Sequence, residues 1–333
     1  MAGQGAFILG CAGPVLGADE AAFFAQAQPW GFILFARNVE NPDQLRGLCA
    51  ALRAAVGRDA PILIDQEGGR VQRLRAPHWR EFLPPLDQVT RVGPAQAARS
   101  MWLRGALIGA EMAALGIDVN CAPTADIASD QTHAFLHNRC YGTTPDGVIA
   151  MARAMADGMA ASGVQSVLKH IPGHGRATAD SHFDLPRVDA DLAALRATDF
   201  APFAALADLP MAMTAHIVYD ALDPAQCATQ SPRVIDLIRG EIGFAGLLMS
   251  DDIAMQALSG DIGARGRASV AAGCDLVLHC NGDMAEMVQV ADACGPMGAM
   301  AQARADAVIA ARPKGQPLDI TALAAEFDAM LGA

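Results

Sequence analysis

The sequence predicts an α/β protein, folded as a single-domain (β/α)₈ TIM barrel that spans residues 1–333. Three observations favour this fold. Eight short apolar runs alternate with stretches of helical character, the pattern of a parallel sheet covered by helices. Polar and charged residues directly follow several of these runs. The chain has 333 residues, of which 52% are hydrophobic, so it can fill the core of one large barrel.

The predicted strands are short and almost wholly apolar, as expected of strands that are buried on both faces. In chain order they are residues 6–11, 31–36, 61–64, 117–121, 165–168, 211–214, 246–249 and 274–278. Helices are expected between them at residues 19–28, 42–56, 96–115, 145–162, 190–206, 232–241 and 262–272. Three of these helices start at an N-cap residue followed by proline: Asn41-Pro42, Thr144-Pro145 and Ser231-Pro232. Residues after about 281 are expected to form closing helices.

An open, doubly wound sheet is the alternative to a barrel. Such sheets often bind a dinucleotide through a Gly-x-Gly-x-x-Gly turn after the first strand. No such turn follows residues 6–11, and this favours the barrel. No linker or low-complexity tract divides the chain.

Polar residues cluster where the predicted strands end. They are residues 65–73 after the third strand, Asn120 and residues 123–126 at the fourth, Lys169 and His170 at the fifth, His216 at the sixth, and residues 250–252 at the seventh. In a barrel these positions are neighbours on the C-terminal rim, where the active sites of this fold lie. The sequence therefore predicts a catalytic site on that rim.

Composition restricts the partners and the compartment. The formal net charge of −12 argues against a nucleic acid or an anionic membrane as partner. No apolar run approaches the roughly 20 residues that span a bilayer, and the N-terminus lacks the basic leader of a secretory signal. None of the eight cysteines forms a Cys-x-x-Cys pair, so we expect buried thiols in a reducing compartment. We expect a cytoplasmic, monomeric protein.

The stretch 169–184 contains an unusual concentration of polar side chains. Lys169 and His170 end an apolar run, and Pro172-Gly173-His174-Gly175 then opens a loop that cannot be regular helix or strand. Asp180 and His182 are two residues apart, so in extended backbone their side chains point to the same side. A carboxylate beside an imidazole orients it and raises its basicity.

These residues carry a family resemblance. Lys-His-Ile-Pro-Gly-His-Gly at 169–175, followed by Asp-Ser-His at 180–182, resembles the signature of the β-N-acetylhexosaminidases of glycoside hydrolase family 3, in particular the bacterial cell-wall-recycling type. Asp-Gln-Glu-Gly-Gly-Arg-Val-Gln-Arg at 65–73 and the stretch 246–255 are similar to two further motifs of that family. The resemblance implies a (β/α)₈ barrel with no metal or organic cofactor.

Asp251 and Asp252 follow the seventh strand, where one carboxylate can face the barrel mouth while its neighbour faces away. A carboxylate at the rim can attack the anomeric carbon of a sugar, or it can cap a helix. The residues alone leave both readings open. The resemblance implies that Asp251 is the nucleophile and that Asp252 is structural.

The resemblance implies that His182, assisted by Asp180, is the general acid and base. Most retaining glycosidases use a second carboxylic acid for this step. An imidazole can do the same work near neutral pH, because its ordinary pKa is about 6.5. Without the motif, a histidine in a loop reads as a surface residue.

Five residues are expected to bind the sugar. Asp65 and Arg73 bracket a Gly-Gly turn, where they could bind sugar hydroxyls or merely pair with each other. The resemblance implies that both bind N-acetylglucosamine, as do Arg139, Lys169 and His170. Cys140, after Arg139, departs from the serine that is more frequent in the family.

The activity implied is that of a retaining exo-β-N-acetylglucosaminidase that removes terminal N-acetylglucosamine from muropeptides, such as N-acetylglucosaminyl-1,6-anhydro-N-acetylmuramoyl species. Its partner is then a small-molecule carbohydrate. Three alternatives remain open: a phosphorylase on the same scaffold, a sugar-binding protein, and a metal-dependent barrel hydrolase. The last would use His170, His174 and His182 as a zinc set, although Lys169 would repel the cation.

Overall fold

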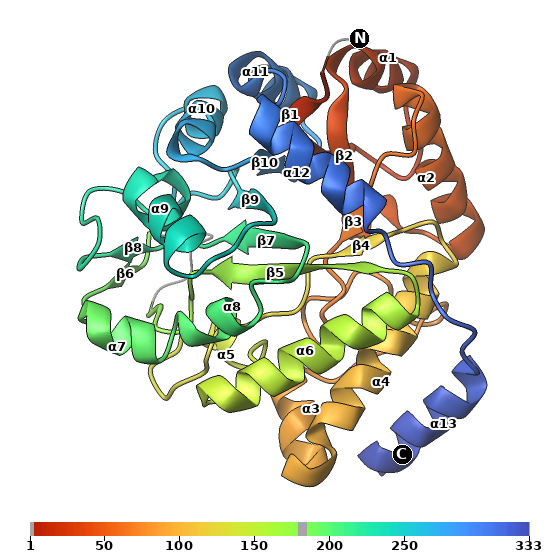
Figure 1. Cartoon of the computed structure of the whole chain (residues 1–333). Coiled ribbons are helices and arrows are strands. Elements are labelled where there is room, and N and C mark those ends of the chain that lie inside the picture. Colours follow the sequence, from red (N-terminus) through yellow and green to blue (C-terminus); the bar gives the residue numbers. More distant parts are fainter. Residues whose placement is uncertain (1–2, 179–184, 333) are drawn as a thin grey trace.

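A computed structural model describes residues 3–178 and 185–332 and shows a closed barrel of eight parallel strands (Figure 1). The barrel order is β1-β10-β9-β7-β5-β4-β3-β2. The strands are β1 (Gly5–Gly10), β2 (Pro29–Leu34), β3 (Ile62–Ile64), β4 (Val119–Asn120), β5 (Gln165–Ile171), β7 (Met211–Thr214), β9 (Leu247–Asp252) and β10 (Leu276–His279). Each overlaps one of the eight predicted strands, so the predicted barrel is confirmed.

Helices follow the strands and surround the barrel. They are α1 (Ala18–Ala27), α2 (Pro42–Val56), α3 (Pro85–Val92), α4 (Pro94–Ala113), α5 (Ala134–His137), α6 (Pro145–Ala161), α7 (Leu192–Ala197), α8 (Ala201–Ala205), α9 (Pro232–Gly240), α10 (Ile262–Ala272), α11 (Met284–Cys294), α12 (Ala299–Ala310) and α13 (Ile320–Leu331), with short 3₁₀ turns η1 (Ala36–Asn38) and η2 (Ala228–Gln230). The single helix expected at 190–206 is two helices, α7 and α8. Pro202 lies in the first turn of α8, where it needs no N–H partner, and it could not lie inside a continuous helix.

Strand residues alternate between two cores, because successive side chains of a strand point to opposite faces. One core lies between the barrel and its helices; Ile62 and Ile64 of β3 belong to it. The other fills the barrel and includes Leu63, Val167 and Met249. The inward register of each strand therefore leads from the filled interior up to the C-terminal rim.

The opposite end of the barrel is covered by α12, which crosses it in Figure 1. Ala305 and Val308 of this helix join the interior core. Asp275, just before β10, is 6% exposed and pairs with Arg304 of α12 and with Arg239 of α9, at 2.7 and 2.6 Å. A buried carboxylate thus joins two helices to the N-terminal end of a strand.

A two-stranded parallel sheet outside the barrel was not predicted. Its strands, β6 (Arg187–Val188) and β8 (Val218–Tyr219), have only two residues each, which is too short for a visible apolar pattern. No helix in the described residues has both the length and the apolar character needed to cross a membrane. All eight cysteines are free thiols, as predicted, and seven of them are buried.

Candidate active site

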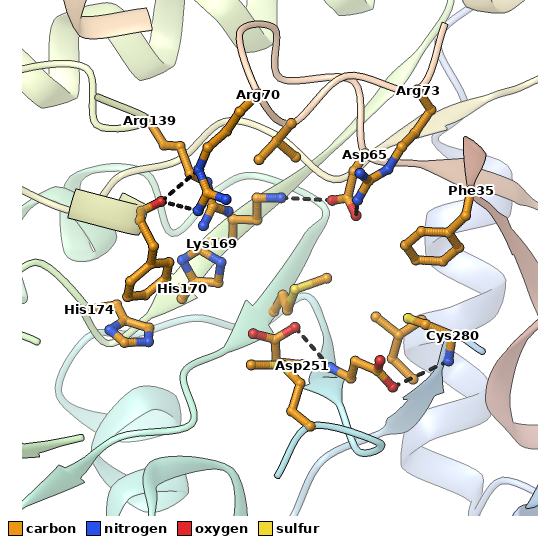
Figure 2. A pocket seen from close by; sticks show the side chains of 16 residues that line it. Phe35, Asp65, Arg70, Arg73, Arg139, Lys169, His170, His174, Asp251 and Cys280 are labelled. Atoms are coloured by element: carbon orange, nitrogen blue, oxygen red, sulfur yellow. Dashed lines mark hydrogen bonds and ion pairs between the residues drawn. The ribbon is translucent and has the colours of Figure 1, made fainter. Parts of the chain in front are cut away.

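A cavity opens at the C-terminal rim of the barrel (Figure 2). Several of its lining residues lie in the inward register of the strands or continue it just past the strand end, so the strand period itself directs them toward the cavity. They are Phe35 after β2, Asp65 after β3, Lys169 in β5, Met213 in β7, Asp251 in β9, Leu278 in β10 and Cys280 after it. Arg70, Arg73 and Arg139 reach the same cavity from loops. Residues predicted at the ends of the third, fifth and seventh strands thus line one cavity.

One wall of the cavity is a chain of charges that alternate in sign. Arg73 Nη2 lies 3.2 Å from Asp65 Oδ2, and Asp65 Oδ1 lies 2.9 Å from Lys169 Nζ. Lys169 Nζ lies 2.6 Å from Glu67 Oε1. Both carboxylate oxygens of Glu67 bind Arg139, at 2.8 and 2.9 Å. Asp65 and Arg73 therefore pair with each other and also line the cavity.

Burial and pairing act in opposite directions on these groups. Burial would raise the carboxyl pKa values, but Lys169 and Arg73 lower the pKa of Asp65, and Arg139 and Lys169 lower that of Glu67. Burial would lower the pKa of Lys169, but Asp65 and Glu67 raise it. Pairing therefore favours the charged forms of Asp65, Glu67 and Lys169, and charged groups are strong partners for sugar hydroxyls.

The loop after β3 is fixed by amides and glycines. Gln66 Oε1 accepts hydrogen bonds from the N–H groups of Arg73 and Leu74, at 2.9 and 3.0 Å. Asn120 binds the backbone of Gln66 through both its amide oxygen and its amide nitrogen. Gly68 has φ +100°, and a Cβ there would lie 1.9 Å from Arg104 Nη2. The sequence Asp-Gln-Glu-Gly-Gly thus sets where Asp65 and Arg73 stand.

Asp251 and Asp252 have different surroundings. Asp251 lies in the inward register of β9, and its carboxylate faces the cavity in Figure 2, where its Oδ1 accepts a hydrogen bond from the Asp252 N–H at 2.8 Å. The Oδ1 atom of Asp252 accepts from the N–H groups of Ala254 and Cys280, at 3.0 and 3.2 Å. Both residues line the cavity, but the Asp252 carboxylate is bound to the backbone of neighbouring segments, whereas the Asp251 carboxylate faces the cavity.

The electrostatic environment of Asp251 favours its ionised form. Burial would raise its pKa, but His216, His170 and the Asp252 N–H lower it below its ordinary value. His216 is held in place because its Nδ1 pairs with Thr229 Oγ1 at 2.7 Å and its Nε2 with the Asp252 carbonyl at 3.0 Å. For Asp252, burial raises the pKa. The two neighbours are therefore shifted in opposite directions.

His170 has a carboxylate partner of its own. Its Nδ1 lies 2.6 Å from Asp126 Oδ2, and Asp126 Oδ1 accepts the N–H of His174 at 2.6 Å. Asp126 is fully buried. Such a partner fixes the orientation of an imidazole ring. In β5 the pairing with β7 is irregular between Lys169 and Ile171, and both Lys169 and His170 line the cavity there.

The side of the cavity near β2 and β10 is less polar. Phe35, Leu278 and Cys280 line it, and the Arg73 guanidinium lies 5.0 Å from the centre of the Phe35 ring. The Arg37 guanidinium lies 5.2 Å from the same ring and also binds the carbonyls of Cys11 and Cys280. An apolar ring beside polar groups suits a sugar, which has both C–H and hydroxyl faces.

The predicted acid/base pair, Asp180 and His182, lies outside the described residues. The described residues on either side of residues 179–184 have partners in the body of the protein. The Arg176 guanidinium binds Asp199 at 2.7 Å, and Val188 lies in the small β6–β8 sheet. Among residues 3–178 and 185–332, no group of three or more His, Cys, Asp or Glu side chains is arranged to hold a metal ion.

The structure brings six predicted site residues together around the cavity: Asp65, Arg73, Arg139, Lys169, His170 and Asp251. Sequence reasoning did not assign a role to Glu67, Asp126 or Phe35. Signals for all three existed, because Glu67 lies inside the recognised motif, Asp126 follows the fourth strand, and Phe35 continues the inward register of the second.

Known proteins resemble this chain over most of its length. The family model described as Glycosyl hydrolase family 3 N terminal domain matches residues 16–310. The Beta-hexosaminidase of Alkalilimnicola ehrlichii is 38% identical over 282 residues, which cover 83% of this chain and 81% of that protein. The Beta-hexosaminidase of Pseudomonas aeruginosa is 38% identical over 283 residues, covering 84% and 83%.

Solved structures share the fold over almost the whole chain. NagZ from Neisseria gonorrhoeae, in complex with N-trifluoroacetyl-D-glucosamine, has a TM-score of 0.86 and 30% identity and covers 99% of both chains. A glycoside hydrolase family 3 beta-N-acetylglucosaminidase from a Paenibacillus species has a TM-score of 0.86 and 27% identity, covering 98% of this chain and 67% of that one. The chain belongs to glycosyl hydrolase family 3, and it is a glycoside hydrolase of the β-N-acetylhexosaminidase type.

Proposed function

We propose that the protein is a retaining exo-β-N-acetylglucosaminidase that removes the non-reducing terminal N-acetylglucosamine of muropeptides, including those that end in 1,6-anhydro-N-acetylmuramic acid. The observation that carries the proposal is the placement of Asp251. Its carboxylate faces the cavity, its pKa is lowered, and the same cavity is lined by Asp65, Arg73 and Lys169. The sugar complex of the related NagZ supports N-acetylglucosamine as the sugar.

In the first step, an Asp251 oxygen forms a bond to the anomeric carbon while the bond from that carbon to the leaving oxygen breaks. His182, assisted by Asp180, gives its proton to the leaving oxygen. In the second step His182 takes a proton from water, the water oxygen binds the anomeric carbon, and the bond to Asp251 breaks. Two displacements at one carbon retain the β configuration.

The binding wall has a distinct part in this reaction. Asp65 accepts sugar hydroxyl hydrogens, while Arg73, Arg139 and Lys169 donate hydrogen bonds to sugar oxygens. His170, oriented by Asp126, lies between this wall and Asp251 in Figure 2 and lines the same cavity as both. Charged hydrogen-bond partners that are already in position hold the anomeric carbon within reach of Asp251.

The test is to trap the intermediate. The protein is mixed with a 5-fluoro analogue of N-acetylglucosamine, which slows breakdown of the glycosyl-enzyme, and is then examined by intact-mass spectrometry and peptide mapping. We expect an adduct of one N-acetylglucosamine analogue on Asp251. An adduct elsewhere would contradict the nucleophile assignment. Product analysis in phosphate buffer separates a hydrolase from a phosphorylase, because only a phosphorylase yields the sugar 1-phosphate.

A further inference from the structure

Glu67 occupies an unusual position beside the cavity. It is fully buried and does not line the cavity, yet its carboxylate is at the centre of the charged wall. Oε1 contacts both Lys169 Nζ and Arg139 Nη2, at 2.6 and 2.8 Å, and Oε2 accepts from Arg139 Nε at 2.9 Å. Glu67 thus lies behind the cavity surface, but its two ion-pair partners, Lys169 and Arg139, line the cavity.

The backbone of Glu67 is held by other groups. Its N–H donates to the Val71 carbonyl at 2.9 Å, and its carbonyl accepts from the guanidinium of Arg104, with Nε at 3.0 Å. Arg104 is also fully buried and is fixed in turn by Gln88 Oε1 at 2.6 Å. The loop is therefore anchored without the Glu67 carboxylate, whose side-chain partners among the described residues are Lys169 and Arg139.

Lys169 and Arg139 need such a partner. Both are cations, 2% and 7% exposed, and they share one carboxylate oxygen. Water cannot screen their repulsion at this depth, so without an anion between them the two side chains would separate or become costly to bury. Lys169 retains Asp65 at 2.9 Å, but Arg139 is joined to the rest of the wall through Glu67.

We propose that Glu67 is a positioning residue for sugar recognition, whose carboxylate fixes Lys169 and Arg139 in one buried geometry that matches the hydroxyl groups of a bound sugar. The inference rests on the proposed function, since it assumes that the wall binds N-acetylglucosamine. Glu67 acts through its two partners and has no contact with the substrate.

The test is the variant Glu67→Gln, which has nearly the same shape but no charge. We expect KM for an aryl β-N-acetylglucosaminide and Kd for N-acetylglucosamine, measured by calorimetry, to rise roughly tenfold to a hundredfold, the same scale as the loss of a group that orients a metal ligand. The value of kcat should fall by a smaller factor. A rise in KM with little change in kcat reports lost binding shared by ground state and transition state.

Asp275→Asn is the matched control. Asp275 is also a buried carboxylate that bridges two cations, Arg239 and Arg304, but it lies at the N-terminal end of the barrel. This variant should lower the unfolding temperature and leave KM and Kd unchanged. If Glu67→Gln does not fold, Glu67→Asp is measured instead. It retains the charge, but it is one methylene too short to hold both partners, so it should raise the same two constants.

The outcomes separate the two levels of inference. If the wild type turns over the substrate and the folded Glu67 variant has KM and Kd within twofold of wild type, the positioning role is wrong. The same conclusion follows if Asp275→Asn raises KM as much as Glu67→Gln does. If the wild type itself neither turns over nor binds N-acetylglucosaminides, the proposed function is wrong, and the role of Glu67 in it is overturned with it.

Discussion

At the scale of single residues, the two adjacent aspartates should differ sharply. If Asp251 is the nucleophile, Asp251→Asn removes the charge that attacks the anomeric carbon, so kcat should fall by roughly 10⁴–10⁶-fold, the scale seen when a catalytic group is removed. Asp252→Asn keeps an oxygen that can accept hydrogen bonds from the Ala254 and Cys280 N–H groups. Its fold-loss in kcat should therefore be at least about tenfold smaller than that of Asp251→Asn. Steady-state kinetics on an aryl N-acetylglucosaminide measures both. Equal losses would remove the distinction between the two carboxylates.

A second prediction at this scale concerns His182. If His182 protonates the leaving oxygen, His182→Ala should slow substrates with poor leaving groups far more than activated aryl glycosides, because only the former need the proton. Comparing kcat/KM for a nitrophenyl glycoside with that for a disaccharide tests this directly. The same fold-loss on both substrates would rule out the acid role.

Site residues were predictable where one motif contains both the residue and its chemistry. Asp65 and Asp251 belong to this group because they lie at the C-terminal ends of β3 and β9, and Arg73 belongs to it because it ends the motif that starts at Asp65. Glu67 does not, because its partners, Arg139 and Lys169, are 72 and 102 positions away in the sequence and meet it only in the fold. A local pattern cannot show such a convergence.

At the scale of elements, the loop after β3 depends on its glycines. Gly68 has φ +100°, and a Cβ there would lie 1.9 Å from Arg104 Nη2 and 2.8 Å from Phe82 Cβ. Gly68→Ala should therefore lower the free energy of unfolding by more than the roughly 1 kcal/mol that the backbone conformation alone costs. It should also raise KM, since the loop carries Asp65 and Arg73.

Gly57→Ala is the control for that variant. Gly57 ends α2 with φ +64°, and a Cβ added there would have no atom within 4 Å, so only the conformational cost applies. Denaturant unfolding of both variants gives the comparison. If the two variants lose the same free energy, then the contact with Arg104 does not restrict position 68.

Element positions were predictable from the sequence to within a few residues, and the differences have physical causes. β5 and β9 extend to Ile171 and Asp252, past the apolar runs, because Lys169 and Asp251 point into the cavity and so remain part of a strand. Polar side chains normally mark the end of a buried strand. At the rim of this cavity, the strands continue through them. The β6–β8 sheet gave no signal because each strand has two residues.

At the scale of the whole molecule, stability should depend on pH through buried histidine. Burial lowers the pKa of His174 to about 4, whereas an unfolded histidine titrates near 6.5. Between these values the unfolded chain binds more protons, so stability is lost as the pH falls from 6.5 towards 4. The loss is about 3 kcal/mol for this group.

The measurement is the difference between His174→Gln and wild type in urea unfolding at pH 7.5 and at pH 4.5. The comparison with wild type is needed because Glu111 changes the pH dependence of stability in the opposite direction, and this contribution is the same in both proteins. Burial raises its pKa to about 7, so stability due to Glu111 increases as the pH falls from 7. The variant should lose less stability than wild type between the two pH values. If the variant and wild type lose the same free energy of unfolding between pH 7.5 and pH 4.5, then His174 has the same pKa in the folded and unfolded chains.

The C-terminal helix should influence sugar binding from a distance. Phe327 of α13 is 1% exposed, and its ring packs on that of Phe82 at 5.8 Å, edge to face. The Phe82 carbonyl accepts the Gly69 N–H at 2.8 Å, and the Phe82 ring lies 5.4 Å from the Arg104 guanidinium. A continuous set of contacts thus joins α13, the last helix in Figure 1, to the loop that carries Arg73.

Phe327→Ala should lower the free energy of unfolding by about 3–4 kcal/mol, as expected for a buried aromatic side chain replaced by alanine. Because the ring supports the loop that carries Asp65 and Arg73, KM should also rise several-fold while kcat changes less. Phe24→Ala is the control. Phe24 is equally buried, but it belongs to α1 and packs edge to face at 4.9 Å on Phe32 of β2. A similar KM in the two variants would mean that α13 stabilises the barrel without positioning the loop. A rise of KM in Phe327→Ala alone would establish that α13 supports the loop after β3, which is far from it in the sequence.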